Sequence, residues 1–170
     1  MRFSFYILYL FFTVSVSFTS KLSEYSNIQD YYDDAIEVRN SGDSEGCLQM
    51  LLQIEDLHIE SNYAIAELYL NQIKNPNIAL DYYKKVILKV KQDLRLQDTD
   101  KSKNLYRKSL FMVSYIYSNY LGMYSDALKN YELFLKEFPN DELIESVKYE
   151  MELLKPFEES KKQLIGGNNG

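Results

Sequence analysis

Two side chains in this sequence have the chemistry of a nucleophile and its base. Cys47 is the only cysteine and His58 the only histidine, eleven residues further along. A nucleophilic pair needs the thiol and the imidazole within hydrogen-bond reach, whereas eleven residues of a straight helix span ~16 Å. Free cysteine is also among the residue types most often buried. The sequence therefore predicts no catalytic residues and a core position for Cys47.

A cluster of carboxylates is the other group that could hold a ligand. Asp30, Asp33 and Asp34 fall within one helical turn, and carboxylates at that spacing can share a divalent cation. The chain has no calcium-loop pattern, and the glycines Gly42 and Gly46 do not form a phosphate-loop pattern. We interpret the aspartates as a solvated acidic face. The sequence predicts no metal site and no cofactor.

The charges are separated along the chain. The formal net charge is −6, and an acidic balance argues against general nucleic-acid binding. Residues 24–60 are rich in acids and contain Arg39 as their only Lys or Arg, whereas most charged residues in 84–108 are basic. One interpretation is that charged outer helix faces keep the protein soluble. The other is a basic docking surface for an acidic partner or for anionic headgroups.

The first twenty residues differ from the rest and resemble a secretory signal peptide. Arg2 is their only charge, and an apolar block runs from about Phe5 to Phe18. This block is shorter than the ~20 residues that span a membrane, so we expect cleavage near Thr19 and an exported protein. The alternative is an uncleaved anchor in residues 1–20 that tethers the chain to a membrane. Cys47 lies too far away to carry a lipid at the mature N-terminus.

Residues 24–170 predict an all-α fold. Only three prolines occur, no alternating strand pattern appears, and turn residues recur at intervals. We expect Pro76 to begin one helix and Asn140 to cap another. The predicted helices cover residues 28–41, 44–58, 61–73, 77–94, 102–121, 124–138 and 141–155, with a short helix after Pro156.

The stretch from Tyr115 to Pro139 has the spacing of a helix–turn–helix unit. An aromatic residue precedes a glycine turn, a small and a large apolar residue follow one turn apart, and a proline closes the unit, at Tyr117, Gly122, Tyr124, Ala127, Tyr131 and Pro139. This pattern resembles the tetratricopeptide repeat (TPR) family. Two weaker copies precede it, and their small second-helix residues, Cys47 and Ala79, lie 32 residues apart, with 48 residues from Ala79 to Ala127. The longer interval leaves room in residues 90–104 for a longer helix, a loop or both.

The resemblance implies a short solenoid of about three helical hairpins over residues 24–155. Small residues would lie where helices cross closely, namely Ala35, Ala66 and Ser114 on first helices and Cys47, Ala79 and Ala127 on second helices. The helix after Asn140 would cap the stack, and residues 156–170 would form a short helix and a disordered tail. Residues 127–154 resemble the TPRs of envelope proteins of the Tol-Pal accessory and BamD-like types, which implies the periplasm or cell envelope.

Helix register in that family predicts a protein-binding groove on the first helix of each repeat. Its residues would be Tyr32, Ile36, Arg39, Tyr63, Glu67, Leu70, Phe111, Tyr115 and Ser118. The aromatics at one recurring position suit a peptide or helix with apolar side chains, whereas the convex face or the ends of the stack are alternative docking surfaces. The resemblance implies a non-catalytic interaction scaffold of the bacterial envelope with a protein or peptide partner. Its alternatives are a membrane-tethered adaptor in outer-membrane assembly or Tol-Pal-like maintenance, and the regulatory subunit of an enzyme.

Overall fold

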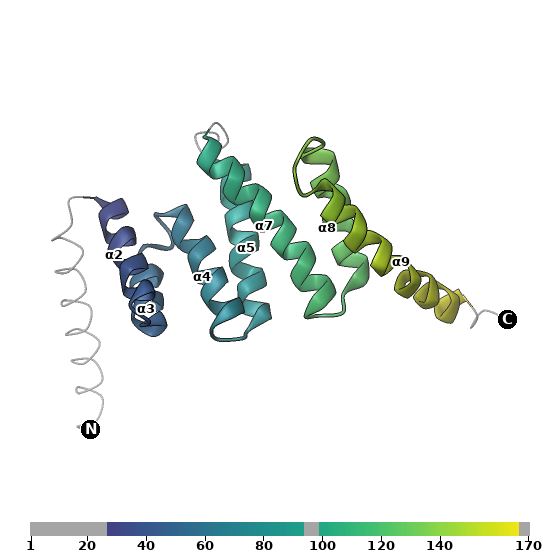
Figure 1. Ribbon diagram of the computed structural model, residues 1–170, viewed down its shortest axis with the longest axis horizontal. Helices are drawn as coiled ribbons and strands as arrows, with labels where there is room; N and C mark the ends of the chain where they lie inside the picture. Colours follow the sequence, from purple (N-terminus) through teal and green to yellow (C-terminus); the bar gives the residue numbers. More distant parts are fainter. Residues whose placement is uncertain (1–26, 94–98, 167–170) are drawn as a thin grey trace, which may run out of the picture. The chain divides into compact units, whose positions relative to one another are not determined.

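The computed structural model describes residues 27–93 and 99–166, and these residues form helices without any strand (Figure 1). This confirms the all-α prediction for the described part of the chain. The helices are α2 (Ile28–Asn40), α3 (Ser44–Ile54), α4 (Ile59–Asn71), α5 (Pro76–Gln92), α7 (Asp100–Asn119), α8 (Tyr124–Glu137) and α9 (Ile144–Gly166). The predicted signal peptide, residues 1–20, lies outside the described residues. Within the described ranges, none of the helices has both the length and the apolar character needed to span a membrane.

Polar side chains define where several helices begin. The side chains of Asn27, Asp43, Asn75 and Thr99 accept hydrogen bonds from main-chain N–H groups in the first turns of α2, α3, α5 and α7. These bonds satisfy donors that have no partner inside a helix. Pro76 is the first residue of α5, as its position after Asn75 predicts.

The start of α9 differs from the sequence prediction. The predicted helix begins at Asp141 after an Asn140 cap, but α9 begins at Ile144. The reason is local, because Asp141 Oδ1 accepts a hydrogen bond from the Leu143 N–H at 2.9 Å and closes a turn before the helix.

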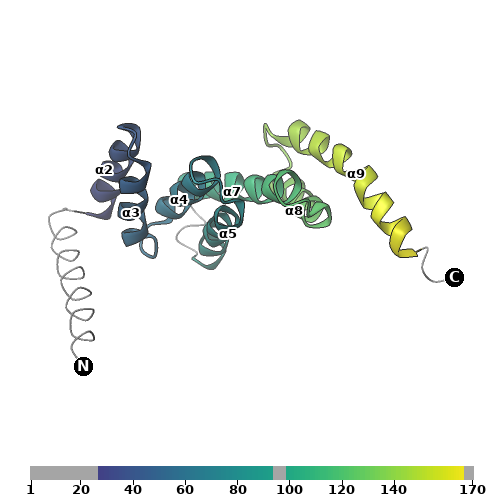
Figure 2. The ribbon, with the colours of Figure 1, turned by 90° about the horizontal axis from the view of Figure 1, so that it is seen from below.

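The end of α9 also differs, because the helix continues through Pro156 to Gly166 (Figure 2). The sequence predicts a break there, since proline lacks the N–H that would bond the carbonyl of Glu152. Both Pro156 and Glu152 are exposed, so water can solvate that carbonyl. Residues 156–166 therefore belong to α9, and residues 167–170 lie outside the described residues.

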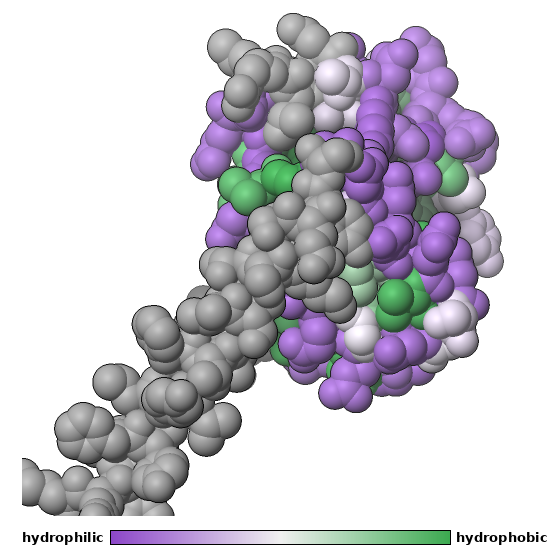
Figure 3. Space-filling model, turned by 90° about the vertical axis from the view of Figure 1, so that its left-hand side faces the viewer, coloured by the Kyte–Doolittle hydropathy of each residue, from purple (hydrophilic) through white to green (hydrophobic). Residues whose placement is uncertain are grey.

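The described residues divide into two compact units between His58 and Ile59. The first unit contains α2 and α3, which pack against each other. Its core consists of Tyr31, Ala35, Cys47, Leu48, Leu51 and Ile54, all buried. The end view in Figure 3 shows mostly hydrophilic residues on the described surface, with apolar residues in small separate patches. The sequence predicts one domain over residues 24–155, and the described residues of this range fall into these two units.

The second unit is a row of helices in which neighbours along the chain pack together (Figure 1). Contacts join α4 to α5, α5 to α7, α7 to α8 and α8 to α9, and α4 also contacts α7. Ala66, Ala79, Ser114 and Ala127 are completely buried, so a larger side chain at these positions would have to displace its neighbours. Within residues 90–104, α5 ends at Gln92 and α7 begins at Asp100. Residues 94–98 lie outside the described part.

Candidate functional site

The groove residues predicted in the first unit lie half-buried on α2. The ring of Tyr32 contacts the ring of His58, with centroids 4.7 Å apart. His58 Nε2 lies 3.4 Å from Gln29 Oε1, so the imidazole is held against α2. Ile36 and Arg39 follow on the same face of this helix.

Cys47 and His58 occupy different environments in the first unit. The predicted helix 44–58 ends early, at Ile54, so His58 follows α3 instead of lying on it. Cys47 is completely buried, as the sequence predicts. Burial raises the pKa of the Cys47 thiol, while the charge of Arg39 lowers it and that of Asp43 raises it. A thiol with a raised pKa is a packing residue at neutral pH and a weak nucleophile.

Asp30, Asp33 and Asp34 are exposed on α2. Asp30 accepts a hydrogen bond from Asn27 Nδ2 at 3.0 Å, and Asp33 accepts one from Gln29 Nε2 at 2.8 Å. In residues 27–93 and 99–166, no group of three or more His, Cys, Asp or Glu side chains is arranged to hold a metal ion.

In the second unit, four predicted groove residues form what we call the α4–α7 face. Tyr63 and Glu67 lie one turn apart on α4, and Phe111 and Tyr115 lie one turn apart on α7. All four are half-buried. The two helices are in contact. Burial raises the pKa of Tyr63, and the charge of Arg107, one turn before Phe111, partly offsets this rise. The face is therefore assembled from residues more than forty positions apart in the chain.

Two other predicted groove residues are not on this face. Leu70 is 2% exposed and belongs to a core cluster with Ala66, Tyr83 and Ile116. Ser118 is 8% exposed, and its hydroxyl donates to the main-chain carbonyl of Tyr115 at 3.1 Å. We correct the predicted groove by removing both residues, because their positions in the helical register point toward the core.

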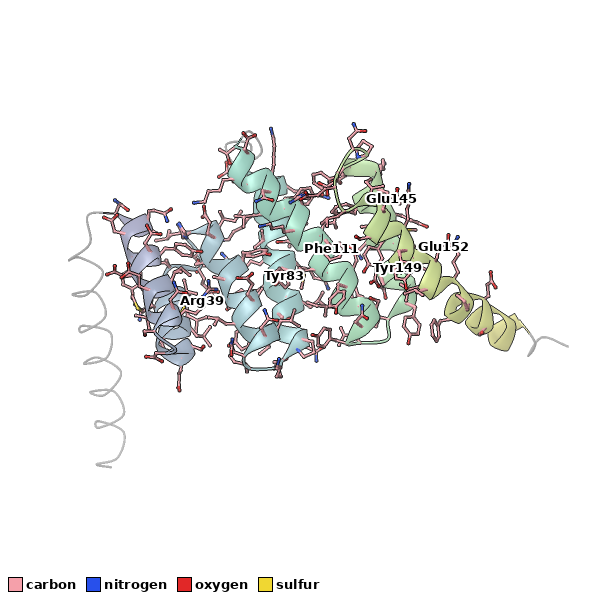
Figure 4. The ribbon with its side chains drawn as sticks, in the orientation of Figure 1. Arg39, Tyr83, Phe111, Glu145, Tyr149 and Glu152 are labelled. Carbon is pink, nitrogen blue, oxygen red and sulfur yellow. The ribbon has the colours of Figure 1, made fainter. Side chains whose placement is uncertain are left out.

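Aromatic rings support the α7 side of the face. The ring of Phe111 stacks on Tyr115 at 6.4 Å and meets Tyr131 and Phe134 edge-on at 6.1 and 6.3 Å. Tyr131 and Phe134 come from α8 and are completely buried. Edge-to-face contacts of this kind hold a ring in one orientation. Phe111 therefore has a packing role as well as an exposed part (Figure 4).

On the α4 side, Tyr63 rests on the buried Tyr83. Their ring centroids are 5.4 Å apart in an edge-on arrangement, and Tyr83 of α5 is 1% exposed. Burial raises the pKa of Tyr63 to about 12, with a further increase from the charge of Glu67. Both ring and hydroxyl are thus partly withdrawn from water, which gives the face a fixed aromatic surface with one carboxylate beside it.

Sequence reasoning missed the polar group beneath the face. The hydroxyl of Tyr131 is buried beside the hydroxyl of Ser118, whose hydrogen bonding partly offsets the effects that raise the pKa of Tyr131. Burial raises the pKa of Tyr131, and the charge of Glu150 on α9 raises it further. Glu150 therefore lies within electrostatic reach of the Tyr131 hydroxyl. Nothing in the sequence distinguishes Glu150 from the other acids of its helix.

A cavity of about 450 Å³ lies elsewhere in the second unit. Its lining residues are Val90, Lys91, Lys103, Tyr106, Glu137 and Phe138. The Tyr106 hydroxyl donates to Glu137, and Lys91 lies 3.5 Å from Glu137 and above the Tyr106 ring. The carboxylate of this cavity is therefore already engaged by protein groups.

Comparison of the chain with models of known protein families and with curated proteins gives no match. In its described residues the protein is an all-helical chain with a packed aromatic face on α4 and α7.

Proposed function

We propose that this protein is a TPR-like helical-hairpin scaffold that binds a protein or peptide partner on the α4–α7 face. The order of helix packing supports the repeat assignment, since α4–α5 and α7–α8 form successive pairs and α4 also contacts α7. Such contacts between equivalent helices of neighbouring hairpins are what a stacked repeat requires. The buried small residues Ala79 and Ala127 fit the close helix crossings of that architecture.

The observation that carries the binding proposal is the half-buried aromatic surface over a rigid floor. Tyr63 and Phe111 each rest on completely or almost completely buried rings, so their exposed parts are held in place before a partner arrives. Rings fixed in this way lose little conformational entropy on binding. Aromatic anchors of this kind dominate the energetics of many protein interfaces. We assign apolar side chains of a peptide or helix as the groups that contact them.

The proposal includes export to the bacterial cell envelope, supported by the apolar block at residues 5–18. In the alternative, residues 1–20 are retained and tether the scaffold to a membrane. N-terminal sequencing of the protein isolated from envelope fractions separates the two, because release predicts a start near Ser20 and tethering predicts Met1 or Arg2. Recovery only from the cytosol would contradict export.

The binding assignment is tested by capture of partners from envelope extracts with variant proteins. Tyr115→Ala removes an aromatic of the face that is half-buried, whereas Leu88→Ala removes an exposed apolar side chain of α5. Loss of an anchor residue typically weakens binding by ~2 kcal/mol or more. We expect the Tyr115 variant to lose a partner that the Leu88 variant retains, with equal far-UV helicity. Equal capture by both variants would exclude the face.

A further inference from the structure

A row of apolar side chains is exposed on the last helix. Tyr149, Leu153 and Phe157 are 64%, 50% and 53% exposed. They are four residues apart, so they lie along one face of α9, over ~12 Å of its length. We call them the α9 apolar row. Phe157 is anchored at one side by the ring of Tyr124, whose centroid lies 4.7 Å away.

Apart from the Phe157 contact, the packing of α9 rests on residues outside this row. Val147 and Leu154 are buried, and Met151 packs against the same core cluster. These three residues are spaced three and four apart, which places them on a different face from the α9 apolar row. An isolated exposed leucine is ordinary, but three large apolar residues aligned on a helix that is already packed elsewhere form a surface suited to a partner.

Carboxylates border the α9 apolar row on both edges. Glu145, Glu152 and Glu159 are exposed and spaced seven apart, nearly two full turns, so they form a line along one edge. Glu150 borders the other edge, where its charge raises the pKa of Tyr131. Figure 4 shows Glu145, Tyr149 and Glu152 along α9.

Lys148 and Lys155 lie farther from the row than these carboxylates do. Lys148 is ion-paired to Glu145 at 2.9 Å, and Lys155 is ion-paired to Glu152. By helical position, both lysines lie on the side of the acidic line that faces away from the apolar row. These exposed pairs are weak, so the carboxylates next to the row remain available to a stronger cationic partner.

These charges disfavour a second copy of this chain as the occupant. When two identical helices pair antiparallel through one row, each brings the same edge to the same edge. Glu152 would then face Glu152 of the other copy, and Glu145 would face Glu159. A parallel pair would set the line of Glu145, Glu152 and Glu159 against Glu150. Both arrangements place like charges together, which is unfavourable.

We propose that the α9 apolar row is a docking surface for a basic amphipathic helix of a partner protein. The apolar face of that helix would cover Tyr149, Leu153 and Phe157. Its lysines or arginines would flank the contact and pair with Glu145, Glu152 and Glu150. Helices commonly recognise partners in this way, with side chains spaced three or four apart as anchors. The surface lies on a different helix from the α4–α7 face and does not depend on that assignment.

The test uses the full-length protein and a fluorescently labelled synthetic helix of about 16 residues, ~24 Å long. This probe has leucines on one face and lysines beside them, and a matched probe carries glutamates in place of the lysines. Anisotropy titration should give binding of the lysine probe at least tenfold tighter than that of the glutamate probe. Leu153→Asp should weaken lysine-probe binding at least tenfold, and Glu152→Lys should weaken it severalfold.

Two controls separate this surface from others. Leu88→Asp places the same charge at an exposed leucine of α5 and should leave probe affinity unchanged. Tyr115→Ala should also leave it unchanged, so failure of the α4–α7 face and failure of this surface give different results. The proposal would be overturned if the two probes bound equally well. It would also be overturned if the Leu153→Asp variant, with a native far-UV circular dichroism spectrum, bound the lysine probe as tightly as the unaltered protein does. Self-association in sedimentation that Leu153→Asp abolishes would overturn it too, because the occupant would then be a second copy.

Discussion

Arg107 on α7 forms an ion pair with Asp141, which lies 34 residues later in the turn before α9. The Arg107 Nη1 donates to both oxygens of Asp141, at 3.0 and 2.8 Å. The two side chains are only 19% and 10% exposed. Asp141 Oδ1 also accepts from the Leu143 N–H, so one carboxylate joins α7 to the start of α9. Hydrogen bonding to Asp141 raises the pKa of the Arg107 guanidinium, against an opposing effect of burial.

Asp141→Asn tests the energetic weight of this pair. The amide keeps the shape of the side chain but removes the charge, so we expect a loss of about 1 to 2 kcal/mol in the free energy of unfolding. The control is Glu142→Gln, because Glu142 contacts Arg107 at 3.3 Å but is 77% exposed. Exposed pairs contribute about 0 to 1 kcal/mol. Urea denaturation measures both, and equal small losses would show that the buried pair has no special role.

Ala127→Leu tests the close helix packing of the second unit. Ala127 is completely buried among residues of the core, so the larger side chain should cost about 1 to 3 kcal/mol through overpacking. Glu132→Leu adds the same side chain at an exposed position of α8 and should change stability by less than about 0.5 kcal/mol. Thermal unfolding followed by circular dichroism compares them, and a tolerated Ala127→Leu would contradict the close packing.

Substitutions of Gly122 test the backbone conformation of the turn between α7 and α8. Its φ is +62°, while an added Cβ would meet only the Tyr124 hydroxyl, at 3.9 Å. Space is therefore available, and the cost of Gly122→Ala should come from the left-handed backbone alone, about 1 to 2 kcal/mol. Asparagine tolerates this conformation better, so Gly122→Asn should cost less. Denaturant midpoints measure the difference, and the expectation fails if alanine is the better tolerated residue.

Alkaline pH should destabilise the second unit through Tyr63. Its pKa is raised from 10.0 to about 12 in the folded protein. Between these values the unfolded chain releases a proton that the folded protein keeps, so stability is complete below pH 10 and falls as pH rises toward 12. Tyr63→Phe removes this proton and should make the fall less steep. Unfolding free energies across this pH range test the claim, with Tyr120→Phe as the control at an exposed position. An unchanged slope in Tyr63→Phe would contradict it.

Local signals in the sequence predict most helix boundaries but fail at the end of α3 and at both ends of α9. Asn75 followed by Pro76 marks the start of α5 because both effects act within one turn. The start of α9 depends on Asp141, whose carboxylate is held by Arg107 of another helix. The continuation of α9 through Pro156 depends on the exposure of Glu152 and Pro156 to water. Neither tertiary contact nor exposure can be read from the neighbouring residues.

For the candidate site, helical register predicts the right helices but not every orientation. Tyr63 and Phe111 are half-buried on the expected helices, whereas Leu70 is in the core. A shift of one position around a helix turns a side chain by about 100°, enough to move it from a surface to the core. Glu150 reaches Tyr131 only through the packing of α9 on α8, so no sequence spacing could have indicated it.

Site-specific photocrosslinking in cells tests the central claim, that the α4–α7 face binds a partner. A photoreactive phenylalanine derivative at position 115 replaces a half-buried aromatic of the face, and the same residue at position 88 replaces an exposed leucine of α5. We predict that irradiation joins a partner to position 115 and not to position 88, and that Tyr63→Ala reduces the product. Adducts of equal yield at both positions, or none at position 115 in cells where a partner is captured, would contradict the account.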